Sequence, residues 1–161
     1  MIILLEEALN MMLGVFAMMG VSLVDQDNMQ EVYCGATNIY YESRGEPDFG
    51  QLAVSQVVLN RVKDERYPNT VCEVVWQPKQ FSWTHDGKSD MPKLESEKNK
   101  QAFLKAVYIH LIAEDANDIT NGALWYYAHD RIDPPKWTAD KIVSAVIGGH
   151  TFLTDARKRL N

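Results

Sequence analysis

The sequence predicts one mainly helical domain of the α+β kind, with a small β-hairpin or sheet near its carboxyl end. Residues 28–43, 48–63 and 94–115 place apolar side chains at the three- and four-residue spacing of a helix face. After residue 122, short apolar runs are separated by Gly and Pro, which is typical of short strands. A chain of 161 residues with 46% hydrophobic content can bury one core, so we expect a single domain.

An apolar segment, residues 1–27, precedes the folded domain that we expect over residues 28–161. Within it, 17 mostly apolar residues follow Glu6 and Glu7, and no Lys or Arg occurs before Arg44. Signal peptides begin with a positive region and membrane anchors have basic flanks, so both readings lose their usual support. Three alternatives stay open: a helix that packs on the protein or a partner, a membrane or export anchor, and a signal peptide.

The first domain helix should end before a turn that contains Gly45, which supplies a left-handed position, and Pro47, which prevents continuation. Asp48 and Gln51 resemble a capping box, so a second helix is expected to begin there. The polar residues of this helix mostly fall off its expected buried stripe. That stripe consists of Leu52, Val58, Leu59 and Val62.

Later elements have weaker signals. Thr70 and Glu73 repeat the capping signature and predict a short helix. Residues 77–93 mix Pro, Gly, Asp and Ser with two exposed-looking aromatic residues, and we expect a functional loop there. After the helix at 94–115, the strings GALWYYAHD and IGGHTFL predict strands around a Pro-containing loop, and the pattern also allows a helix near residues 139–146.

Charge and cysteine content exclude several functions. The net charge is −6 and the 16 Lys and Arg residues form no dense run, so we expect no nucleic-acid partner. Neither a C-x-x-C motif nor Cys/His spacing indicates a metal site, and we expect no cofactor. Spacing alone leaves Cys34 and Cys72 either as two thiols or as one disulfide.

The string YYESRGEP at residues 40–47 holds a candidate catalytic acid. Glu42 lies in the last turn of a helix, where the dipole disfavours an ionised carboxylate by roughly 0.3–1 kcal/mol. Apolar neighbours, including Tyr40 and Tyr41, would desolvate it, and both effects raise its pKa. A carboxyl group that stays protonated near neutral pH is what glycosidic cleavage requires.

The second glutamate of the string has the opposite environment. Glu46 precedes the next helix, whose positive end favours the anion, so it should stay charged. We expect Arg44 to pair with Glu46 or with helix-end carbonyls, which would leave Glu42 free to face a cleft. On spacing alone, the alternative to a catalytic acid is that both glutamates are solvated surface residues.

The strings NIYYESRGEPDFGQLAVSQVVLNRV, YPNTVCEVVWQ and QFSWTHDG resemble the spore cortex-lytic enzyme family of SleB-type cell wall hydrolases. The resemblance continues through ALWYYAHD, KW and GGHTF and covers about Val32 to Phe152. It implies a lysozyme-like domain that cleaves peptidoglycan between N-acetylmuramic acid and N-acetylglucosamine, with the catalytic glutamate at Glu42. Similar members are lytic transglycosylases, whose acid protonates the glycosidic oxygen and then acts as base on the sugar's own 6-hydroxyl.

The resemblance and the chemistry of its motifs also suggest substrate-binding residues. These are Glu46, the loop residues Gln80, Ser82 and Trp83, and the strand residues Tyr126, Tyr127 and His129. Core packing is the alternative for Phe81, Trp83, Trp125 and Tyr126, and Trp137 is expected to pack. Many exported relatives are similar but carry four cysteines, two of them where Lys79 and His85 stand here, which favours a Cys34–Cys72 disulfide.

Two rival functions stay open beside the transglycosylase. One is a lysozyme-type muramidase that uses water, with Glu46, Asp86 or Asp130 assisting, and the other is a silent peptidoglycan-binding or structural protein. We expect action in the periplasm or cell wall by an exported, membrane-anchored or phage-delivered protein. The sequence lacks the family's wall-binding repeats, so residues 1–24 could contact a membrane or a virion partner. A phage endolysin, a virion-associated lysin and an anchored bacterial wall-remodelling enzyme all suit this organisation.

Overall fold

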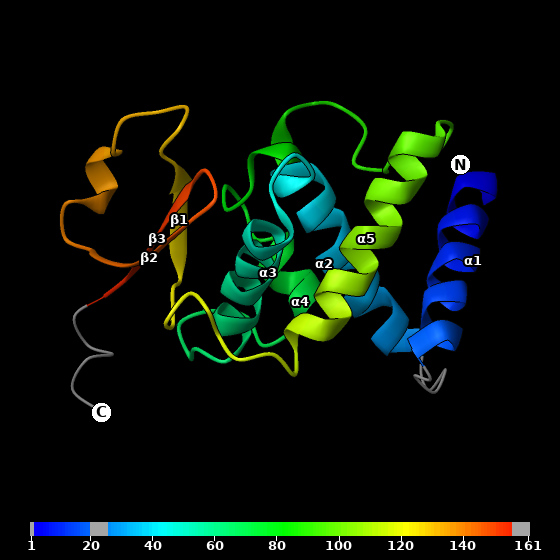
Figure 1. Ribbon diagram of the computed structural model, residues 1–161, viewed down its shortest axis with the longest axis horizontal. Helices are drawn as coiled ribbons and strands as arrows, with labels where there is room; N and C mark the ends of the chain where they lie inside the picture. Colours follow the sequence, from blue (N-terminus) through cyan, green and yellow to red (C-terminus); the bar gives the residue numbers. More distant parts are fainter. Residues whose placement is uncertain (1, 20–25, 156–161) are drawn as a thin grey trace.

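The computed structural model describes residues 2–19 and 26–155 (Figure 1). Its α-helices are α1 (Ile2–Met19), α2 (Gln26–Ser43), α3 (Asp48–Val62), α4 (Val71–Val75) and α5 (Glu97–Ala113). The short 3-10 helices are η1 (Ser82–His85) and η2 (Lys136–Thr138). The strands are β1 (Trp125–Ala128), β2 (Ile142–Ile147) and β3 (His150–Thr154). The predicted class, mainly helical with a small sheet, is confirmed.

The sheet lies at one end of the molecule and α1 at the opposite end, with α5, α2 and α3 between them (Figure 1). Both sheet pairings are antiparallel, and β3 is the central strand, in the order β1-β3-β2. The helix allowed near residues 139–146 is wrong, because Ile142–Ile147 is a strand paired with β3. Its β-branched residues suit a pleated surface better than a helix.

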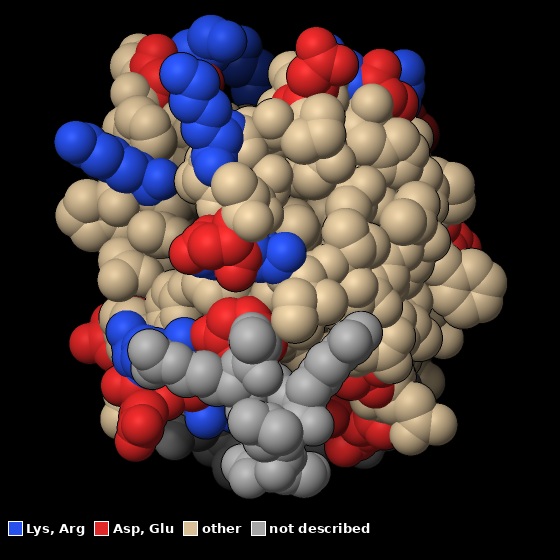
Figure 2. Space-filling view, turned by 90° about the vertical axis from the view of Figure 1, so that its left-hand side faces the viewer, with Lys and Arg blue, Asp and Glu red and all other residues tan. Residues whose placement is uncertain are grey.

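Figure 2 views the molecule from the sheet side. Acidic and basic side chains are mixed at the top, at the left and near the centre of this face, and a broad area without charged residues covers its right-hand centre. Two exposed residues of β2, Val143 and Val146, show that this strand keeps apolar side chains on the surface. The face therefore has no single strongly basic or acidic field.

Helix α3 is the central helix of the body, in contact with α2, α4, α5 and β2. Residues 50–59 are all buried, including Ser55 and Gln56. Leu52, Val58 and Leu59 of the expected stripe are buried, but the expectation that the polar residues lie mostly off the buried surface is wrong for Ser55 and Gln56, because α3 has neighbours on almost every side. Its buried amide is satisfied: Gln56 donates to Asn117 O at 2.9 Å and accepts from Ile119 N at 3.0 Å.

The turn between α2 and α3 differs from the sequence expectation. Gly45 does not have a positive φ; instead, Glu46 N donates to Ser43 O at 2.8 Å and closes the turn. The expected capping box is also wrong, since Asp48 begins α3 without a side-chain cap. Gln51 Nε2 donates back to Glu46 O at 3.1 Å, so its amide satisfies a carbonyl of the turn.

Helix α4 is fixed to α2 by covalent and polar contacts. Thr70 Oγ1 accepts from Glu73 N at 3.2 Å, which confirms the predicted cap. Cys34 of α2 and Cys72 of α4 form a disulfide, with 5.2 Å between their Cα atoms. The Glu31 carboxylate accepts from the Cys72 N–H at 3.3 Å, so an acid also meets the positive end of the short helix.

Helix α1 packs along α5. Its buried residues are spaced four apart: Ala8, Met12 and Phe16. Glu7 also pairs with Lys100 of α5 at 2.5 Å. The described part of α1 thus packs on the protein, one of the three alternatives for this segment, whereas residues 20–25 lie outside the described residues. In the part of the chain that is described, no helix has the length and apolar character needed to cross a bilayer.

Buried His110 predicts a loss of stability in acid. Its ring on α5 is 1% exposed and lies 2.9 Å from Ser55 Oγ, and burial lowers its pKa from 6.5 to about 4. Between these two pKa values, His110 is protonated in the unfolded chain but not in the folded chain. The free energy of unfolding should therefore fall by about 3 kcal/mol as the pH drops to 4. Above pH 6.5 this residue should give no pH dependence.

Urea unfolding at pH 7 and pH 4.5 measures this effect. The His110→Gln variant, which cannot titrate, should show a smaller loss between the two pH values, whatever its stability at pH 7. An equal loss in both proteins would contradict the assignment of the acid sensitivity to His110.

Candidate active site

A groove of about 320 Å³ opens where the carboxyl end of α2 meets α3, η1 and the sheet. Its walls combine one acid, cations, an amide, a hydroxyl and aromatic rings. The lining residues are Glu42, Arg61, Lys79, Gln80, Phe81, Ser82, Trp125, Tyr126 and Trp137. Glu42 is the only acid among these described residues.

The Glu42 carboxyl is partly buried and accepts a hydrogen bond from the Tyr126 hydroxyl at 3.0 Å. Burial raises the pKa of Glu42, while the Tyr126 hydrogen bond and the charge of Arg61 oppose the rise. The net direction is upward, as expected from the sequence. Burial and the nearby Glu42 also raise the pKa of Tyr126 well above its ordinary value, so its hydroxyl stays a donor.

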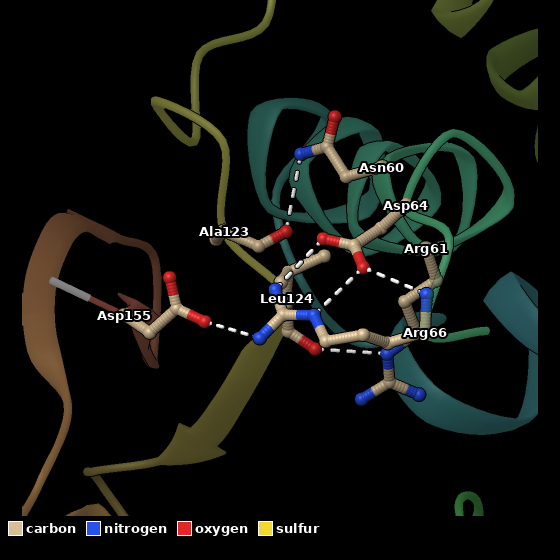
Figure 3. A network of polar contacts seen from close by, with 7 residues as sticks. All are labelled: Asn60, Arg61, Asp64, Arg66, Ala123, Leu124 and Asp155. Atoms are coloured by element: carbon tan, nitrogen blue, oxygen red, sulfur yellow. Dashed lines mark hydrogen bonds and ion pairs between the residues drawn. The ribbon is translucent and has the colours of Figure 1, made fainter. Parts of the chain in front are cut away.

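Polar contacts at the end of α3 fix the chain that leads into β1. Figure 3 shows this network, whose members are Asn60, Arg61, Asp64, Arg66, Ala123, Leu124 and Asp155. Arg61 Nε donates to Leu124 O at 2.8 Å, and Asn60 Nδ2 donates to Ala123 O at 3.1 Å. Arg66 bridges the two aspartates, one after α3 and one after β3. The network thereby holds the strand that carries the groove tyrosine against the central helix.

Arg61 is a groove residue that the sequence reasoning missed. It is 4% exposed, its guanidinium lies 5.4 Å from the ring centre of Phe81, and its Nη1 has no hydrogen-bond partner. Burial lowers the pKa of Arg61. A signal was present, because Arg61 continues the apolar face of Val54, Val57 and Val58 at helical spacing. A charge on a buried face marks a candidate functional position.

Four of the eight site residues predicted from the sequence line the groove. They are Glu42, Gln80, Ser82 and Tyr126. The expectation that Trp137 packs is wrong, since it is 45% exposed and lines the groove. The aromatic residues of the 77–93 loop are not exposed, because Phe81 and Trp83 turn inward and are 3% and 6% exposed.

Three other predicted residues lie outside the groove. Trp83 is buried behind it, and its Nε1 donates to Asn38 Oδ1 at 3.0 Å. Tyr127 follows the groove tyrosine on β1 and therefore points to the opposite face of the sheet. His129 is exposed beyond the end of β1, with Nδ1 3.1 Å from Thr151 Oγ1. A direct substrate contact of these three stays a prediction.

Glu46, the last of the eight, fastens the α2–α3 turn to the β2–β3 turn. Its side chain is 9% exposed, and Oε2 accepts from Gly149 N at 2.9 Å and lies 3.8 Å from His150 Nδ1. The expected pairing of Arg44 with Glu46 or with helix-end carbonyls is wrong. Arg44 instead donates to the Tyr40 hydroxyl at 2.9 Å, one helical turn back, and its guanidinium lies 4.9 Å from that ring centre.

Comparison with known families identifies the class of protein that has this helical body, small sheet and groove with a single acid. The chain belongs to the cell wall hydrolase family, whose model matches residues 45–153. The matched residues begin just after Glu42, so the match does not itself cover the candidate acid.

The particular relatives are spore cortex-lytic enzymes. That of Bacillus cereus (strain ATCC 14579) is 33% identical over 133 residues, which are 83% of this chain and 48% of the relative. This chain thus spans about half the length of the curated relatives that it matches.

Two solved structures are similar over the same share of this chain. The catalytic domain of the germination-specific lytic transglycosylase SleB from Bacillus anthracis has a TM-score of 0.62 and 33% identity over 83% of this chain and 98% of that chain. The catalytic domain of the Bacillus cereus SleB protein has a TM-score of 0.60 and 31% identity over 83% and 100%. The likeness confirms the predicted lysozyme-like build.

Proposed function

We propose that this chain cleaves peptidoglycan glycan strands between N-acetylmuramic acid and N-acetylglucosamine as a lytic transglycosylase, with Glu42 as general acid and base. One observation carries the proposal: among the described residues the groove has a single carboxyl group, and burial raises its pKa. The similarity to a lytic transglycosylase domain supports the same reaction. Residues 28–161 would form the catalytic domain.

In the first step, the protonated Glu42 gives its proton to the glycosidic oxygen. The bond between this oxygen and the anomeric carbon of the muramic sugar breaks, and the glucosamine side leaves as an alcohol. Exposed Gln80 offers an amide to N-acetyl groups, and the half-exposed ring of Trp137 offers a face to a sugar.

In the second step, the Glu42 carboxylate takes the proton of the muramic sugar's own 6-hydroxyl. The hydroxyl oxygen bonds to the anomeric carbon, which gives a 1,6-anhydro product and regenerates the acid without water. The Tyr126 hydrogen bond and the buried charge of Arg61 both favour the carboxylate form of Glu42. These groups therefore stabilise the base that exists only between the two steps.

In the usual glycosidase mechanism, hydrolysis by water uses a second carboxylate near the bond. The three acids considered for that role lie elsewhere: Glu46 is bound to the Gly149 N–H, Asp86 lines another cavity, and Asp130 is exposed beside Gly149. Their placement supports the intramolecular route over a lysozyme-type reaction. It also supports turnover over a silent binding role, since the acid is accessible from the groove.

We also propose that the chain acts in the periplasm or cell wall. The Cys34–Cys72 disulfide supports this, because disulfides persist mainly in oxidising compartments. Export, a membrane anchor, or a virion partner through residues 1–24 are the proposed routes of delivery. A fractionation of cells that express the full chain would test the compartment.

Mass spectrometry of digested peptidoglycan tests the reaction. The purified chain should release muropeptides that end in 1,6-anhydromuramic acid. Reducing ends in their place would indicate a muramidase, and an undigested wall would refute both enzymatic readings. Digestion in water labelled with oxygen-18 adds a control, because the transglycosylase product should carry no label at the cleaved carbon.

Tyr126→Phe should move the alkaline limb of the pH–rate profile to higher pH. The variant loses the hydrogen bond that lowers the pKa of Glu42, so the acid stays protonated to a higher pH. Tyr127→Phe is a matched control, because it makes the same change on the next residue of the strand, outside the groove. A limb that stays in place or moves to lower pH in Tyr126→Phe would refute the coupling.

A further inference from the structure

A second cavity of about 410 Å³ lies next to the groove. On two elements, neighbouring residues line the cavity and the groove. Tyr41 lines the cavity where Glu42 lines the groove on α2, and Trp83 lines it where Ser82 lines the groove on η1. Consecutive Cα atoms are only 3.8 Å apart, so the two cavities are lined from neighbouring positions of both elements.

The second cavity is cationic in a chain of net charge −6. Three of its lining residues are basic, Arg44, Lys88 and Lys93, and one is acidic, Asp86. Lys88 lies 3.8 Å from Asp86. Within the described part of the chain, no ion pair joins Arg44 or Lys93 to a carboxylate, so neither positive charge is paired directly.

The side chain of Arg44 is held in place by Tyr40, which is neutral. Tyr40 is 2% exposed, accepts one hydrogen bond from Arg44 at 2.9 Å, and places its ring under the guanidinium. A guanidinium has five N–H donors, and its planar fork matches a carboxylate. Because Tyr40 fixes the side chain without neutralising it, the remaining donors stay available to a ligand.

Part of the cavity wall is aromatic. The rings of Tyr41 and Trp83 stack with their centres 4.8 Å apart, and the Tyr41 hydroxyl donates to Ser89 O at 3.0 Å. Trp83 is further held by Asn38. The cavity thus combines a preformed apolar wall with two unpaired cations, which suits a ligand that carries both aliphatic groups and a carboxylate.

We propose that this second cavity binds a carboxylate of the peptide stem of peptidoglycan while the glycan strand occupies the groove. This inference rests on the proposed function. The stem is attached to the muramic sugar, next to the bond that would be cleaved, and it carries free carboxylates. An acidic protein gains no long-range attraction for an anionic wall, so recognition of the stem requires local cations such as these.

Binding without turnover tests this proposal. In the Glu42→Gln background, the affinity for an amidase-treated, peptide-free glycan oligomer is compared with that for the same oligomer with its peptides. The double variant Arg44→Gln/Lys93→Gln should weaken binding of the peptide-bearing oligomer by about tenfold or more, because hydrogen bonds to charged groups contribute substantially. Binding of the peptide-free oligomer should not change.

Because Arg44 contacts the core residue Tyr40, its replacement could disturb the fold. The single variant Lys93→Gln, which leaves this contact intact, is the control for misfolding. It should weaken binding of the peptide-bearing oligomer by about threefold, and by less in 0.5 M salt. Lys98→Gln, an exposed lysine of α5 outside both cavities, should have no effect. Equal losses of affinity for both oligomers, or no loss for either, would overturn the stem site but not the proposed function. Failure of the parent protein to bind either oligomer would overturn the proposed function as well.

Discussion

Glu42→Gln is expected to lower the rate of peptidoglycan cleavage by about 10²–10⁴-fold, toward the upper end of this range because one residue serves both proton transfers. The amide has nearly the same shape, and its oxygen can still accept the Tyr126 hydrogen bond, but it cannot donate a proton to the glycosidic oxygen. The release of anhydromuropeptides from purified walls measures this rate. A residual rate above one tenth of that of the wild type would rule out Glu42 as the acid.

The same variant should be at least as stable as the wild type near neutral pH. A carboxyl group whose folded pKa is raised gives its full stability below the unfolded value of 4.5, and this stability is lost as the pH rises through the folded pKa. Glutamine cannot ionise, so it avoids the loss. An inactive variant with an unchanged or higher melting temperature at pH 7.5 therefore separates catalysis from folding. Glu95→Gln, the same change at an exposed position outside the groove, should alter neither quantity.

Local signals in the sequence predicted the elements whose causes are local. The cap of α4 depends on Thr70 and Glu73, which are three residues apart, and the structure has it. The raised pKa of Glu42 was also expected, because it follows from the position at a helix end and from apolar neighbours in the same helix. The strand at 142–147 was misjudged, since its identity depends on pairing with β3.

Contacts between distant segments account for the parts of the site that could not be predicted. The partner of Glu42 is Tyr126, 84 residues away, and only the packing of β1 on the end of α3 brings it there. Glu46 likewise has its partner in a distant segment, whereas Arg44 contacts Tyr40 four residues back on the same helix. Neighbours in sequence suggested that these two residues pair, but the fold offers Glu46 a backbone N–H of the β2–β3 turn. As a result, Arg44 has no carboxylate partner among the described residues.

Gly35→Ala is the structural change with the largest expected effect, a loss of about 1–3 kcal/mol in the free energy of unfolding. Gly35 lies within α2, and a Cβ there would overlap the His110 ring of α5, 2.5 Å from Nε2. The ring has little room to move, because it is 1% exposed and held by Ser55. Glycine within a helix normally costs about 1 kcal/mol relative to alanine, so steric overlap has to reverse an otherwise favourable change.

Urea unfolding of matched variants separates overlap from helix propensity. Gly14→Ala makes the same change in α1, where no atom lies within 4 Å of the new methyl group, and it should stabilise the protein by up to about 1 kcal/mol. If the His110 ring causes the loss, Gly35→Ala should cost little in a His110→Ala background, where the methyl group fills space that the ring has left. The coupling free energy of this double-mutant cycle should then be about as large as the loss itself. A loss of the same size with and without the ring would show that α2 and α5 approach closely at Gly35 for a reason other than His110.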